Sequence, residues 1–226
     1  MKKYFYLFII LLVSSNAFAD INNYKSLSKI EMDVFRNGEK IGFSNYIFSH
    51  KKNEMEVKNN TEFEVKLLGV NLLSIKSSSI EKYENNKLVN FSSKTIQNNK
   101  KKFVNLELNK DTNKFIIDGS SFKGKTDTDK VIGNWWNINI LSVNSQISPL
   151  SGSIKEQVVK LIGRETIVID DKSYETLKYR LKSKNQNLPE DKKLDFEIWL
   201  DTEKGLLVKI SYERMGKWEY ILNNYR

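Results

Sequence analysis

Acidic side chains that share one face of a predicted strand are the first candidates for chemistry in this chain. Asp195, Glu197 and Asp201 alternate along residues 195–201, and Trp199 lies in the same row. Strands can bring distant carboxylates together, so a carboxylate pair of the kind that hydrolyses glycosides stays open as a hypothesis. Lysine is abundant on the neighbouring segments, and we therefore interpret the row as a solvent-facing one that opposes basic side chains.

Other residue types that carry catalysis or bind metals are scarce. The sequence has no cysteine and a single histidine, His50, which removes thiolate nucleophiles, disulfides and metal sites built from Cys or several His. A serine triad would have to use His50, which is predicted at an exposed strand end, and no serine lies in a nucleophile-elbow pattern. We expect no catalytic residue, no metal site and no cofactor, and we predict that the protein is not an enzyme.

Two adjacent indoles followed by an amide, Trp135-Trp136-Asn137, are the least ordinary feature of the sequence. They fall in residues 120–153, the one stretch without strand alternation, where Asn134 is predicted to cap a short helix over residues 134–142. Adjacent residues of a helix point about 100° apart, so both indoles can be buried only if the protein surrounds the helix on more than one side. Either they complete a packed core or, as a lid over an apolar cavity, these three residues form the candidate ligand site.

The elements around this stretch are predicted to be strands. Apolar and charged residues alternate with period two, as at Ile30, Met32 and Val34, and turn-forming pairs such as Asn37-Gly38 and Asn98-Asn99 separate the runs. About a dozen sequential antiparallel strands cannot stay flat, because strand twist makes such a sheet curl or split. We predict an all-β fold: one strongly curved antiparallel sheet, a half-barrel or incomplete barrel, with the short helix plugging its open side. A two-sheet sandwich is the alternative.

The N-terminus has the features of a signal peptide. Lys2 and Lys3 precede an apolar run over residues 4–13, and Ala17-Phe18-Ala19 places small residues before a cleavage site between Ala19 and Asp20. The apolar run has about half the length that a permanent span needs. We predict export, with residues 1–19 as signal peptide and residues 20–226 as one β domain in the periplasm without a permanent membrane anchor.

The net charge of +9 does not by itself indicate nucleic-acid binding. Lysines are scattered along predicted solvent-facing positions and alternate with acids, and no basic run is interleaved with aromatic residues. The densest run, Lys100-Lys101-Lys102, follows Asn98-Asn99 at a predicted hairpin turn. We expect no nucleic-acid partner.

Three motifs together carry a family resemblance. They are residues 37–42 (Asn-Gly-Glu-Lys-Ile-Gly), Trp136-Asn137 with Ser151-Gly152 downstream, and residues 199–201 (Trp-Leu-Asp) followed by residues 205–209 (Gly-Leu-Leu-Val-Lys). In this order after a signal peptide, the chain resembles an uncharacterised family of exported bacterial β-proteins, the domain of unknown function 6134. No site residues are attached to that family. The predicted architecture is also similar to the half-barrel lipoprotein carriers of the Gram-negative envelope, in which a helical lid covers acyl chains, although this chain has only one short helical stretch.

Two functional hypotheses follow from these expectations. The first is a periplasmic protein whose curved sheet binds a lipid or another apolar or amphiphilic ligand. The second is a structural or interaction module of the cell envelope, with a solid core and a protein partner bound at strand edges or on the basic outer face.

Overall fold

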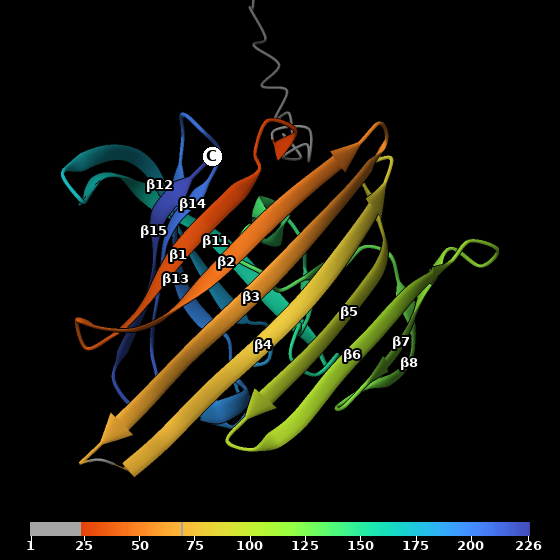
Figure 1. Ribbon diagram of the computed structural model, residues 1–226, viewed down its shortest axis with the longest axis horizontal. Coiled ribbons are helices and arrows are strands. Elements are labelled where there is room, and N and C mark those ends of the chain that lie inside the picture. The colour runs from red at the N-terminus through yellow and green to blue at the C-terminus, as the bar shows by residue number, and fades with distance from the viewer. Residues whose placement is uncertain (1–23, 69) are drawn as a thin grey trace, which may run out of the picture.

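A single β-sheet makes up most of the structure (Figure 1). The computed structural model describes residues 24–68 and 70–226. The first eight strands are β1 (Lys29–Arg36), β2 (Glu39–Lys51), β3 (Glu54–Leu67), β4 (Val70–Glu84), β5 (Lys87–Gln97), β6 (Lys100–Asn109), β7 (Lys114–Gly119) and β8 (Lys123–Asp127). The remaining strands are β9 (Val131–Ile132), β10 (Ser145–Ile147), β11 (Ile154–Ile169), β12 (Lys172–Ser183), β13 (Asp195–Asp201), β14 (Leu207–Glu213) and β15 (Lys217–Tyr225).

The strand order explains why the sheet curls into an incomplete barrel. Its fifteen strands run β8-β7-β6-β5-β4-β3-β2-β1-β15-β14-β13-β12-β11-β10-β9, so the first and last strands pair in the middle. The two edges, β8 and β9, are not paired with each other, although only residues 128–130 connect them. Neighbouring strands are antiparallel except for β9 and β10. The prediction of one curved sheet is confirmed, and the sandwich alternative is wrong.

The hairpin turns are built as the sequence predicts. Asn37, Asn85, Asn86, Asn98 and Asn99 all adopt positive φ, which asparagine tolerates better than most residues. Successive hairpin turns lie alternately at the two ends of the barrel. The mouth end carries the β3–β4 and β5–β6 hairpins, and the filled end carries the β2–β3 and β4–β5 hairpins (Figure 1).

The prediction for residues 120–153 is partly wrong. Residues 134–142 do not form a regular helix: a single 3-10 turn, η2 (Ile138–Leu141), follows the two tryptophans. Its cap is Asn137, whose side chain accepts a hydrogen bond from the backbone N–H of Asn139, and not Asn134. The same stretch contains β8, β9 and β10, which raise the strand number above the expected dozen; two of them are too short to show alternation. A second 3-10 turn, η3 (Glu190–Lys192), lies between β12 and β13.

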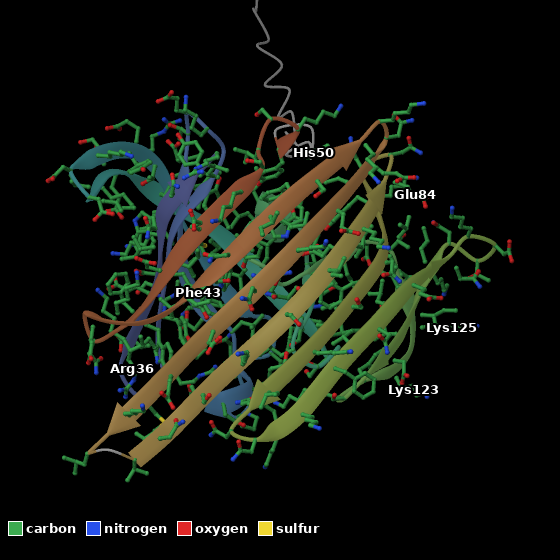
Figure 2. The ribbon with its side chains drawn as sticks, viewed as in Figure 1. Arg36, Phe43, His50, Glu84, Lys123 and Lys125 are labelled. Carbon is green, nitrogen blue, oxygen red and sulfur yellow. The ribbon has the colours of Figure 1, made fainter. Side chains whose placement is uncertain are left out.

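The core fills one end of the barrel. Inward positions of the strands, such as Met32, Phe91 and Leu106, are fully buried, and they pack around Trp136 and Ile140 from the segment between β9 and β10. His50 and Glu84 mark the filled end in Figure 2, and Arg36 and Lys123 lie toward the mouth end. Within the described residues, no helix is long and apolar enough to cross a bilayer. The predicted signal peptide, residues 1–19, lies outside the described residues.

Candidate functional site

A large cavity opens at the mouth end of the barrel. Its volume is about 880 Å³, and it extends between the inner faces of β2–β5 on one side and of β13–β15 on the other. Residues from the β9–β10 segment form its floor, and the connection between β12 and β13 lies at its rim. Volumes of about 300–1,000 Å³ are typical of sites for small organic ligands. The cavity is therefore the candidate binding site.

One wall of the cavity is lined by hydroxyl groups. Ser44, Thr61 and Ser77 line the cavity as direct cross-strand neighbours on β2, β3 and β4, and Ser77 is paired in turn with the buried Thr95 on β5. The Ser44 and Thr61 hydroxyls are 2.7 Å apart, as are those of Ser77 and Thr95. Each occupies an inward register position where an apolar residue would be expected. Because small side chains fill these positions, the barrel stays hollow here and presents a polar surface.

The opposite wall is aromatic. Trp135 packs against Phe196 on β13 with ring centroids 5.0 Å apart and against Tyr220 on β15 at 6.2 Å. Phe196 in turn contacts Tyr212 on β14 at 5.2 Å. Burial raises the pKa values of the Tyr212 and Tyr220 hydroxyls, so both stay neutral phenols at physiological pH. This wall offers flat apolar surface to a ligand.

Cations surround the opening. Lys102, Lys155, Lys192 and Arg214 line it together with one acid, Asp191. The Arg214 guanidinium donates to the backbone carbonyls of Glu190 and Lys193 and so holds the η3 turn at the rim. None of these four cations has a carboxylate within ion-pair distance in the described part of the chain. Their charge is thus available to an anionic group at the mouth.

The floor is anchored by a buried carboxylate, Glu81 on β4. Its Oε1 accepts hydrogen bonds from Asn134 Nδ2 at 2.6 Å and from Trp136 Nε1 at 2.8 Å, and its Oε2 accepts one from the Tyr83 hydroxyl at 2.6 Å. Burial raises the pKa of Glu81, and the three donors oppose that shift only in part. Tyr46 adds a contact through its hydroxyl, 3.3 Å from the backbone nitrogen of Trp135.

The three residues of the predicted ligand site have different surroundings. Trp135 lines the cavity. Trp136 is 1% exposed and lies edge-on to the rings of Tyr24, Phe48 and Tyr83 in the filled end. Asn137 is buried as the cap of η2 and borders a separate cavity of about 240 Å³. Only the first indole therefore lines the large cavity.

The other residues considered from the sequence lie outside the barrel interior. His50 is exposed at the end of β2 and hydrogen-bonds the carbonyl of Leu27. Glu197 pairs with Arg180 at 3.0 Å and with Lys178 at 3.2 Å, and Asp195 pairs with Arg180. Asp201 caps the following turn through the backbone N–H groups of residues 203 and 204. Asp195 and Glu197 therefore oppose basic neighbours, as their sequence context indicates, whereas Asp201 and Trp199 in the same row are buried and not solvent-facing.

Sequence reasoning missed Glu81 and the hydroxyl wall. Both could have been found in the alternation of β4, in which Ile75, Ser77, Ser79, Glu81 and Tyr83 share the inward face. An acid and two serines on the inward side of a long strand indicate that a polar partner or a space lies opposite.

Comparison with known proteins supports the fold and the family. The family model described as "Domain of unknown function (DUF6134)" matches residues 32–223, in agreement with the resemblance seen in the sequence motifs. Among solved structures, the chain is similar to a beta-barrel-like protein of domain of unknown function DUF1849 from Brucella abortus. The TM-score is 0.60 at 8% sequence identity, with 88% of this chain and 97% of that chain covered. At that identity the likeness concerns the fold alone. No curated protein matches the sequence.

Proposed function

The chain belongs to the DUF6134 family of domains of unknown function, and we propose that it is a non-enzymatic cell-envelope protein that binds an amphiphile in its barrel. The observation that carries this proposal is the cavity of about 880 Å³ at the mouth end. An aromatic wall, a hydroxyl wall and a cationic rim suit a molecule with an apolar body and a polar or anionic end.

The walls favour an amphiphile over a purely apolar ligand. Trp135 and Phe196 present apolar ring surface, whereas Thr61 and Ser77 present hydroxyls across the cavity. These hydroxyls bond neighbouring side chains, but each oxygen can accept a further hydrogen bond, which a covering hydrocarbon would leave unused. A ligand with a polar group facing the hydroxyls, an apolar body against the rings and an anionic end near Lys102 would match the hydroxyl wall, the aromatic wall and the cationic rim.

Binding is a better proposal than catalysis for the carboxylates of this chain. Asp195 and Glu197 are engaged by Arg180 on the outer face, and Glu81 is enclosed by three hydrogen-bond donors in the floor. A general acid or base has to reach a substrate atom. The envelope location rests on the signal-peptide features of residues 1–19. An intact mass equal to that of residues 20–226, measured in the periplasmic fraction, would support it.

The experiment that tests ligand binding is a titration with a fluorescent fatty-acid analogue. Ser77→Met would extend a longer side chain into the cavity, whereas Ser78→Met places the same side chain on the outer face of the same strand. We expect the inward variant to weaken binding about tenfold or more, because pockets discriminate strongly against lost volume, and the outward variant to bind as the wild type does. Equal affinity in all three proteins would contradict the proposal, as would the absence of binding to the wild type. Melting curves establish that each variant is folded.

A further inference from the structure

Two turns at the mouth end carry an apolar residue in the left-handed backbone conformation. Positive φ is mostly adopted by Asn, Asp or Gly in this protein, as at Asn85 (φ 48°) and Asn98 (φ 45°). Three residues depart from this pattern: Lys52 (φ 47°) at the filled end, and the apolar Leu68 (φ 50°), between β3 and β4, and Met215 (φ 51°), between β14 and β15. The left-handed conformation is unfavourable for a leucine, whose Cβ crowds the backbone. An apolar side chain at these tips is therefore not explained by the folding of the turn.

Both apolar tips face solvent. Leu68 is 96% exposed and Met215 82% exposed, and Val70 and Leu72 beside Leu68 are 63% and 41% exposed. The β3–β4 hairpin lies at the lower left of Figure 1, at the mouth end, and Leu73, three residues after Val70 on β4, lines the cavity. One short stretch of β4 thus carries an apolar residue of the cavity wall, Leu73, and the exposed apolar residues Val70 and Leu72.

The charge around the apolar tips is mainly positive. Lys100 and Lys101 lie at the neighbouring β5–β6 hairpin, and Lys192 and Arg214 lie at the rim. Within the residues that the structure describes, these four have no carboxylate within ion-pair distance. Among the described residues, three acids at the mouth end also lack an ion pair: Glu39, Asp191 and Glu213. Apolar tips flanked by excess cations are complementary to an anionic bilayer surface.

We propose that the mouth end docks on an anionic lipid bilayer, with Leu68, Val70 and Met215 inserted among the lipids and the surrounding lysines on the head groups. This surface goes beyond the proposed cavity function, because it requires no ligand in the barrel. It would bring the opening of the cavity against the membrane, where a bilayer amphiphile could enter without crossing water.

The test is vesicle flotation of the secreted protein, with its N-terminus defined by intact mass. One set of vesicles contains phosphatidylglycerol and phosphatidylethanolamine, and the other contains phosphatidylcholine alone. The variant Leu68→Asn/Val70→Thr makes the tip polar with residues that suit its backbone. The control Leu161→Thr/Ile162→Thr removes two equally apolar side chains, 57% and 59% exposed, midway along β11.

We expect wild type and control to float with the anionic vesicles, and the tip variant to bind them about tenfold or more weakly, as for one lost apolar anchor. Raised salt should weaken wild-type binding, because exposed charges are screened. The proposal is overturned if the tip variant floats as the wild type does, if the control loses binding equally, or if the wild type binds neither vesicle or prefers phosphatidylcholine. These outcomes leave the fatty-acid titration unaffected, so the two proposals can fail separately.

Discussion

The indole N–H of Trp136 donates a hydrogen bond to the buried carboxylate of Glu81, with Nε1 and Oε1 2.8 Å apart. Residue 81 lies on β4, and residue 136 lies in the segment that crosses the barrel between β9 and β10. This contact, with the Asn134 amide on the same oxygen, fastens the crossing segment to the sheet. It also fixes the backbone from which Trp135 extends into the cavity.

Glu81→Gln is expected to destabilise the protein. A glutamine keeps the shape but replaces one acceptor oxygen with an NH₂ group that faces the donors of Asn134, Trp136 or Tyr83. A buried donor left without an acceptor costs about 2 kcal/mol in the free energy of unfolding. Urea denaturation measures the loss; an unchanged midpoint would show that the carboxylate does not hold the segment.

The difference in stability between wild type and Glu81→Gln should depend on pH. Burial raises the pKa of Glu81 above the ordinary value of a glutamate, which applies to the unfolded chain. As pH rises above the unfolded value, the unfolded chain loses this proton first, and the wild type therefore loses stability until pH passes the folded pKa. The variant lacks this titration, so its deficit should be largest at acidic pH and shrink toward neutral pH. Urea midpoints of both proteins across that range measure the trend, and a constant deficit would contradict it.

Gly42→Ala should be strongly destabilising. A Cβ at Gly42 would lie 2.0 Å from the backbone carbonyl oxygen of Glu62 on β3, so the strands would have to move apart. We expect a loss of roughly 2–3 kcal/mol. Gly163→Ala is the matched control, because a Cβ there meets no atom within 4 Å. Thermal melting of the two variants compares them, and equal melting temperatures would contradict the steric account.

Leu68→Asn should stabilise the fold. Asparagine adopts the left-handed φ of this turn more readily than leucine does, which is worth about 1 kcal/mol. The reciprocal change Asn85→Leu, at a turn with nearly the same φ, should destabilise by a similar amount. Chemical denaturation of both variants measures the pair. A loss of stability on Leu68→Asn would mean that the leucine supports the turn.

Trp135 should report ligand entry. It lines the cavity, whereas Trp199 lies on the outer face beneath the ammonium groups of Lys178 and Lys209, 4.6 and 5.2 Å from its ring centroid. On addition of a non-fluorescent fatty acid, the tryptophan emission of wild type and Trp199→Phe should change. Most of that response should be lost in Trp135→Phe. A response that survives this substitution would place the ligand elsewhere.

The local signals in the sequence predicted the strands and turns well. Alternation at Ile30, Met32 and Val34 and the Asn37-Gly38 turn depend on neighbours along the chain, and the structure confirms both. The crossing segment was harder, because its conformation is decided by partners far away in sequence. Asn134 reads as a helix cap, but its amide is used by Glu81 instead, and the 3-10 turn begins only at Ile138.

The sequence suggested an apolar cavity as one of two alternatives, but it did not show which residues would line that cavity. Trp135 and Trp136 are equivalent by sequence, yet one lines the cavity and the other is packed among aromatic rings. The difference arises because the Trp136 indole N–H donates a hydrogen bond to Glu81 on β4. The two residues lie far apart in the sequence, and no local pattern around either one predicts that they pair. Likewise, Ser44, Thr61 and Ser77 form a wall only once the strand register aligns them.

The central claim, that the barrel holds an amphiphile, is tested most directly by native mass spectrometry of the protein purified gently from producing cells. The account predicts a species heavier than the polypeptide by the mass of a small amphiphile, released on denaturation and depleted in Ser77→Met but not in Ser78→Met. The bare polypeptide mass in all three proteins, even after incubation with excess fatty acid, would contradict it.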